Sequence, residues 1–175
     1  DAEEADRLTL SLKVIEAVLS DPELAGWHGF GIVVQAYGRR AGAVIDWLHA
    51  LATRLDRKIM IRLVKGAYWD AEVKRAQVLG LPDFPVFTRK EATDVSYIAN
   101  AQKLLGLTDR IYPQFATHNA HTVAAILDMV LDNNDGVYPI VTHSLTDALR
   151  GAIALLKVDK DARQLPLMPF VTPAK

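Results

Sequence analysis

The amino-acid sequence predicts an α/β protein in which parallel strands alternate with helices. Short apolar runs rich in β-branched and aromatic residues predict strands, and helical patterns with one apolar face lie between them. The strand runs are nearly continuous in apolar residues, which is typical of parallel strands buried on both faces. Doubly wound sheets and (βα)8 barrels share this alternation, and the chain has no glycine-rich nucleotide-binding motif that would favour the former.

The predicted elements follow in the order that right-handed βαβ crossovers produce. Strands are expected at residues 29–37, 58–68, 110–118 and 138–143. Helices are expected at residues 8–19, 44–55, 70–79, 88–106, 123–130 and 144–156. The capping boxes Thr88-x-x-Glu91 and Ser144-x-x-Asp147 are expected to start the fourth and the last of these helices. Residues 164–175 are rich in proline and predict an extended tail.

Composition excludes several classes of protein. The 20 Lys and Arg residues against 21 Asp and Glu give a formal net charge of −1, so no overall positive field draws the chain to nucleic acid. The lack of cysteine excludes a disulfide scaffold, a thiolate nucleophile and a cysteine zinc site. Asp46 and Asp128 interrupt the most apolar stretches, and no signal peptide is visible, so a cytoplasmic protein is expected.

Functional side chains are expected where the strands end, because the carboxyl ends of parallel strands meet on one rim. Arg62 and Lys65 bring two cations into a strand that otherwise resembles core. They predict an anionic partner, which is either a ligand or a structural carboxylate. Gly66 allows close approach of the backbone, and Tyr68 and Trp69 offer flat surface for an aromatic cofactor or for core packing.

A second group follows the third predicted strand. Thr117, His118 and the backbone amides of the next two residues lie at a helix start, which favours phosphate binding. His118 and His121 lack the third ligand that a zinc site needs, so no metal is expected. Thr88-Arg89-Lys90 forms a third cationic group, which either binds an anion or is simply solvated.

Several segments in the same order resemble the proline dehydrogenase domain of bacterial bifunctional proline-utilisation flavoenzymes. They are Asp1-Ala-Glu-Glu-Ala-Asp-Arg-Leu8, Glu23-Leu-Ala-Gly-Trp27, Arg62-Leu-Val-Lys-Gly-Ala-Tyr-Trp69, Thr88-Arg-Lys90, Thr93-Asp-Val-Ser-Tyr97 and Tyr112-Pro-Gln-Phe-Ala-Thr-His-Asn-Ala-His121. The resemblance covers about residues 1–129.

The resemblance implies a (βα)8 barrel that binds FAD at its rim. It implies oxidation of L-proline to Δ1-pyrroline-5-carboxylate by hydride transfer to the flavin, with electrons passed to quinone or another acceptor. Arg62 would lie near the flavin ring, where a cation stabilises the reduced, anionic form. Leu63 and Tyr68 would line the proline pocket, and Asp1 would orient an arginine of the substrate site. The other implied cofactor contacts are Gln35, Val64, Gly66, Trp69, Thr88, Arg89, Lys90, Thr117 and His118.

The resemblance divides the chain into a partial proline dehydrogenase barrel at residues 1–130 and an unmatched strand, helix and tail at 131–175. The family's first strand with its substrate-site lysine, and its closing helix with paired arginines, have no counterpart here. Four strands cannot close a barrel of eight, so exposed sheet edges, self-association and little or no turnover by the segment alone are expected. The full-length family protein would be cytoplasmic or peripheral to the inner membrane.

Two other functions stay open. The chain is alternatively a non-enzymatic remnant or interaction module that at most binds a ligand or a partner chain. A Schiff-base aldolase is the third reading, with Lys65 at a strand end as the nucleophile, activated by neighbouring Arg62. The aldolase hypothesis leaves the phosphate-like groups and Trp69 unexplained.

Overall fold

In the computed structural model, residues 4–133, 136–141 and 153–158 are described. They form a five-stranded sheet of order β1-β2-β3-β4-β5. Its strands are β1 Gly31–Gln35, β2 Ile59–Val64, β3 Ile111–Phe115, β4 Gly136–Val141 and β5 Ile153–Val158. The helices are α1 Leu8–Leu19, α2 Ala41–Arg54, α3 Trp69–Val78, α4 Lys90–Leu105 and α5 Ala120–Asn133, with a short 3-10 turn at Pro22–Leu24.

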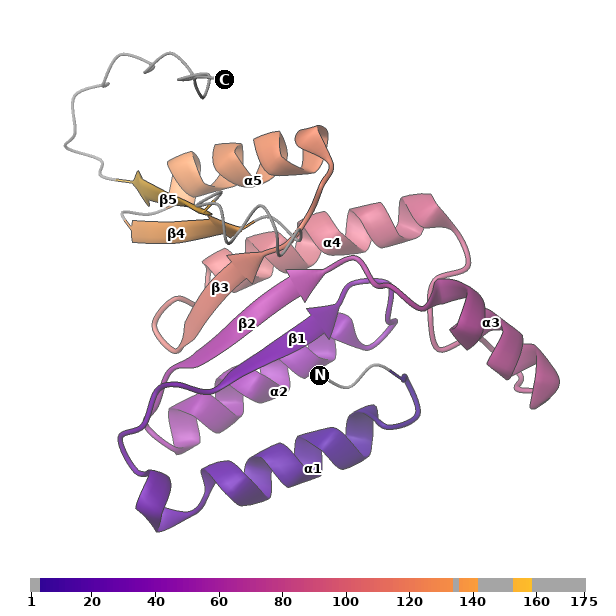
Figure 1. Cartoon of the computed structure of the whole chain (residues 1–175), viewed down its shortest axis with the longest axis horizontal. Helices are drawn as coiled ribbons and strands as arrows, with labels where there is room; N and C mark the ends of the chain where they lie inside the picture. The colour runs from indigo at the N-terminus through magenta and orange to yellow at the C-terminus, as the bar shows by residue number, and fades with distance from the viewer. Residues whose placement is uncertain (1–3, 134–135, 142–152, 159–175) are drawn as a thin grey trace, which may run out of the picture.

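Strands β1 to β4 pair in parallel, each joined to the next through helix, as in part of a (βα)8 barrel. Figure 1 shows α2 and α4 on one face of the sheet, α5 beside α4, and α3 projecting from the end at which the strands point. Helix α1 lies along the β1 edge, where Leu19 joins the core and Leu8, Leu12 and Ile15 pack against it. The predicted α/β class and the incomplete barrel are confirmed.

Burial within the strands is one-sided. On β2, Ile59, Ile61 and Leu63 are fully buried against the helices, whereas Arg62 between them is exposed. Met60 and Val64, which share the opposite face with Arg62, are only half-buried. The expectation of strands buried on both faces is therefore wrong here, because an unclosed barrel leaves its inner face open.

Helix α4 joins the ends of three strands to one another. The Ser96 hydroxyl donates to the Ala36 carbonyl oxygen at 2.7 Å, just beyond β1. The hydroxyl of Tyr97, which is fully buried, donates to the carbonyl oxygens of Ala116 at 3.2 Å and Leu63 at 3.4 Å. Burial raises the pKa of Tyr97, so the ring stays neutral and remains a donor at physiological pH. The rim of the sheet is thereby tied to a single helix.

Two predicted details of secondary structure are wrong. The helix expected to reach Leu156 is replaced at its end by β5, which pairs antiparallel with β4; residues 144–152 of that helix lie outside the described part. A mostly apolar segment of six residues suits either a helix or a strand, and pairing with β4 decides between them. Helix α4 begins without the Thr88 capping box, because the backbone stays extended through Arg89, which is the N-cap.

Candidate functional site

A cavity of about 540 Å³ opens at the carboxyl ends of β1, β2 and β3. This volume lies within the range of about 300–1,000 Å³ that small-molecule sites occupy. The predicted site residues that line it are Gln35, Arg62, Val64, Gly66, Tyr68, Lys90, Thr117 and His118. Arg62 from β2 and His118 from the loop after β3 therefore meet at one rim, as the strand-end argument requires.

Arg62 lies in a row of side chains that the strand register builds across the inner face of the sheet. Val33 on β1 and Gln114 on β3 are its register partners on either side. The Arg62 Nε donates to the Gln114 Oε1 at 3.3 Å. Among the described residues no carboxylate forms an ion pair with Arg62, so its charge is directed at the cavity.

Gly66, just beyond the end of β2, allows the Tyr37 ring to pack closely against the backbone. Its φ is +128°, and a Cβ at this position would fall 2.5 Å from Cγ of the Tyr37 ring. Burial and, to a lesser degree, the Glu72 carboxylate raise the pKa of Tyr37 to about 12, which keeps its ring neutral. Glycine is thus required at position 66 for two reasons: its positive φ, and the lack of space for a Cβ beside the Tyr37 ring.

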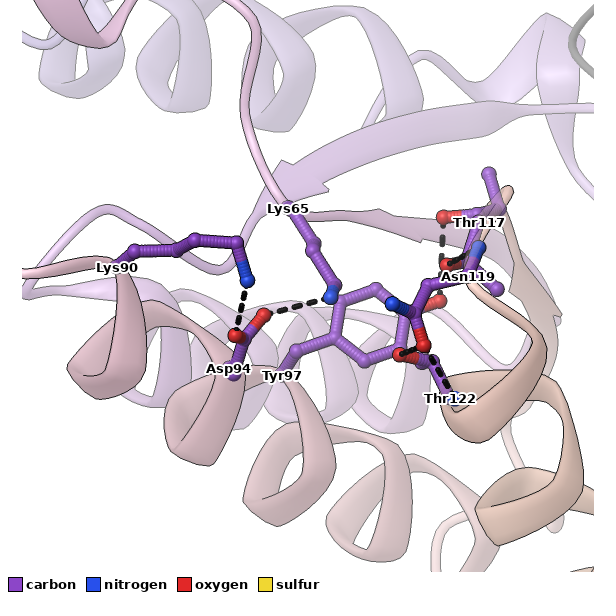
Figure 2. A network of polar contacts seen from close by, with 8 residues as sticks. Lys65, Lys90, Asp94, Tyr97, Thr117, Asn119 and Thr122 are labelled. Atoms are coloured by element: carbon purple, nitrogen blue, oxygen red, sulfur yellow. Dashed lines mark hydrogen bonds and ion pairs between the residues drawn. The ribbon is translucent and has the colours of Figure 1, made fainter.

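Lys65 and Lys90 share one carboxylate behind the cavity. Lys65 Nζ lies 2.6 Å from Oδ1 of Asp94, and Lys90 Nζ pairs with the other oxygen of the same group (Figure 2). Hydrogen bonds from Lys65 and then Lys90 lower the pKa of Asp94, so the carboxylate is ionised at neutral pH. For Lys65 the predicted anionic partner is thus a structural carboxylate.

This arrangement predicts a pH dependence. The pKa of Asp94 is lower in the folded chain than its unfolded value of about 3.9, so its contribution to stability is present above that pH. The contribution is lost as the pH falls through the folded value. We expect the difference in unfolding free energy between the unaltered chain and Asp94→Asn, measured by urea denaturation, to shrink below about pH 4. A difference that grows on acidification would contradict this assignment.

The loop after β3 is organised by its own side chains. Thr117 Oγ1 accepts a hydrogen bond from the Asn119 N–H at 3.1 Å. Asn119 Oδ1 in turn accepts from the Thr122 N–H at 3.0 Å and so caps α5. The Asn119 amide, one of the predicted phosphate donors, is therefore already bonded within the loop.

The remaining predicted residues lie elsewhere. Leu63 belongs to the fully buried core on the helix side of the sheet and does not line this cavity, because strand alternation turns it away from Arg62. Trp69, Thr88 and Arg89 are not among the lining residues, and the Trp69 indole N–H donates to the Phe87 carbonyl oxygen at 2.7 Å. Asp1 lies outside the described residues.

Sequence reasoning missed the lining residues Val33, Ala67 and Ala116, whereas Lys65 and Asn119, which it did consider, also line the cavity. Gln114 and Asp94 were missed because each acts through a neighbour. The sequence feature that could have indicated Gln114 is its polar side chain within an otherwise mostly apolar strand. For Asp94, the only signal was its spacing of four residues from Lys90 on a helix.

The aldolase alternative finds little support in this geometry. An aldolase needs a free amine that can attack a carbonyl carbon, whereas Lys65 Nζ is bound to the Asp94 carboxylate at 2.6 Å. Across residues 4–133 and the two described strands that follow, no three histidine or acidic side chains gather as metal ligands. No helix in the same part of the chain is long and apolar enough to cross a membrane.

The parallel strands, the helices on one face and the cation-lined cavity at the rim are those of part of an α/β-barrel domain. The family model described as proline dehydrogenase matches residues 1–159. The chain belongs to the proline dehydrogenase family.

Curated relatives agree with this assignment. The bifunctional protein PutA of Klebsiella aerogenes is 62% identical over 133 residues, which are 76% of this chain and 10% of the relative. PutA of Escherichia coli K12 is 61% identical over the same shares. The chain thus spans about a tenth of the length of these relatives.

Solved structures agree as well. A crystal structure of a bifunctional proline utilization A protein superposes with a TM-score of 0.73 at 65% identity, over 74% of this chain and 13% of that one. A PutA structure from Bdellovibrio bacteriovorus, inactivated by N-propargylglycine, superposes with a TM-score of 0.68 at 37% identity, over 71% of this chain and 13% of that one.

Proposed function

We propose that the cavity is part of an FAD site at which L-proline is oxidised to Δ1-pyrroline-5-carboxylate. The observation that carries the proposal is the meeting of Arg62 and His118, from successive strand ends, in one cavity with two further cations, Lys65 and Lys90. Membership of the proline dehydrogenase family supports the reaction class.

The residues present fit FAD. Three cationic side chains suit a dinucleotide that carries a diphosphate, and Gly66 presents backbone without a side chain to the cavity. The chemistry that FAD supplies when bound is acceptance of the hydride released as the C–N bond of proline becomes a C=N bond.

The chain's own residues would bind and orient. Arg62, held by Gln114, would lie beside the ring and stabilise negative charge on it. Lys90, Thr117 and His118 would hold the diphosphate side, and Tyr68, which is 42% exposed, would contact the substrate. Electrons would then pass to quinone or another acceptor, as in the family.

The first test is reconstitution with FAD. The purified chain is incubated with FAD, desalted and examined for flavin absorbance, then mixed with L-proline and a dye acceptor. Flavin retention is expected; turnover is expected to be small, because the five strands of the described residues do not close an eight-stranded barrel. A protein that stays colourless after incubation with FAD would exclude the cofactor site.

Arg62→Ala is expected to weaken FAD binding by about 10- to 100-fold, since a hydrogen bond to a charged group contributes about 1.5–3 kcal/mol. Fluorescence quenching during an FAD titration measures this effect. Arg54→Ala is the matched control, because Arg54 pairs with Glu16 on the surface and does not line the cavity. Equal FAD affinities for the two variants would show that Arg62 does not contribute to FAD binding.

Self-association through sheet edges is a separate part of the proposal. Strands β1 and β5 are the outer strands of the described sheet, and α1 lies along the β1 edge; outer strands whose backbone groups stay free pair readily with other chains. Light scattering of the purified chain over a range of concentrations measures the oligomeric state.

A further inference from the structure

Asp94 lies behind the cavity, between two lysines that come from different elements. Lys65 follows β2, and Lys90 is the first residue of α4, yet one carboxylate binds both ammonium groups (Figure 2). Both lysines line the cavity, whereas Asp94 does not. The carboxylate thus contacts the cavity only through these two side chains.

Stabilisation of α4 does not account for the ion pair between Lys90 and Asp94. A cation placed four residues before an acid is the less favourable order on a helix, and a lysine in the first turn opposes the helix dipole. Lys90 occupies that first turn, and its side chain is 76% exposed. An isolated exposed ion pair of this kind contributes little to stability.

Lys65 is held on two sides. Besides the bond to Asp94, its Nζ lies 5.9 Å from the centroid of the Tyr97 ring, which is within the range of a cation–π contact. Tyr97 is itself fixed to the ends of β2 and β3 by its hydroxyl. These contacts fix the position of Lys65 relative to the rim. Because the second oxygen of Asp94 binds Lys90, the Lys90 ammonium group is fixed relative to Lys65 as well.

We propose that Asp94 is a positioning residue that holds the ammonium groups of Lys65 and Lys90 together at the cavity, as a preformed cationic pair for the phosphates of the cofactor. This inference rests on the proposed FAD site. Without Asp94, two long side chains would have to be ordered when the ligand binds, and that entropy cost would appear in the affinity.

The sign of the effect separates positioning from simple electrostatics. Asp94→Asn removes a negative charge next to two cations, so a purely electrostatic role predicts tighter binding of an anion. Positioning predicts the opposite, because the lysines lose the group that orders them. We expect FAD binding by Asp94→Asn to be weaker by about tenfold.

The experiment titrates FAD and riboflavin, which lacks the phosphates, into the unaltered chain, Asp94→Asn, Asp94→Glu and a control. The control is Asp46→Asn, which also removes a carboxylate paired with a lysine, Lys103, but lies on α2 and does not line the cavity. Urea denaturation of each variant verifies that it is folded. Asp94→Glu keeps the charge and is expected to recover most of the affinity.

Weaker FAD binding by Asp94→Asn, with recovery in Asp94→Glu and unchanged riboflavin binding, supports the positioning role. Equal or tighter FAD binding by Asp94→Asn overturns it and leaves the proposed function standing. If the unaltered chain binds no FAD, the proposed function fails, and inorganic pyrophosphate becomes the probe. Weaker pyrophosphate binding by Asp94→Asn then retains the role of Asp94, whereas binding that is absent or unaffected by the substitution overturns that role too.

Discussion

Replacement of Gly66 by alanine is expected to lower the free energy of unfolding by about 2–5 kcal/mol, through backbone strain and overpacking together. The φ of +128° is one that L-residues rarely adopt, and the added Cβ would lie 2.5 Å from the Tyr37 ring. Tyr37 is 4% exposed, so its ring has little space into which to move. Chemical denaturation measures the loss, and FAD affinity is expected to fall with it because Gly66 lines the cavity.

Gly80→Ala separates the two causes. Gly80 also has a positive φ, +60°, but a Cβ there would meet nothing within 4 Å. Its substitution should therefore cost only the backbone part, about 1–2 kcal/mol. In the Gly66→Ala background, Tyr37→Leu is expected to recover part of the loss by making room. Equal losses at the two glycines would show that the contact with Tyr37 is unimportant.

Leu63→Ala is expected to lower the free energy of unfolding by about 2–5 kcal/mol, because it leaves a cavity in the core. Leu63 is fully buried among the helix-facing side chains of the sheet. FAD affinity, measured under conditions where the variant is folded, should stay near that of the unaltered chain. Arg62→Ala should do the reverse and weaken FAD binding with little change in stability, since Arg62 is exposed.

An exposed leucine provides the control for Leu63. Leu79 follows α3 and is 59% exposed, so Leu79→Ala should change stability by no more than about 0.5 kcal/mol. A Leu63 variant that is as stable as the Leu79 variant but binds proline or FAD poorly would restore Leu63 to the site. The comparison of adjacent residues therefore tests the assignment of the two faces of β2.

Much of the fold could be predicted from local pattern. The apolar stripes of α1 and α2 and the β-branched runs of β1 to β3 depend on residues close in sequence, and these elements appear near their expected positions. The last described strand was harder, since Ile153–Val158 is a short, mostly apolar segment that suits a helix or a strand. Its pairing with β4 is a contact between distant residues, which local pattern does not contain.

The site was predictable to a similar degree. Strand ends and glycine freedom led to Arg62, Gly66 and His118, and all three line the cavity. Leu63 was assigned to the site from its position in a motif, but motif letters do not state which face of a strand a side chain occupies. Asp94 was overlooked because its importance comes from Lys65, which is 29 residues away in sequence.

The sequence by itself determined the alternation of strands and helices, the family and the identity of the cations at the strand ends, because each depends on residue types in short, ordered segments. Only the tertiary structure decided that Arg62 faces the cavity while Leu63 faces the core, and that Asp94 joins two lysines. These outcomes depend on strand register and on the packing of α4 against the rim, which bring together side chains that are distant along the chain.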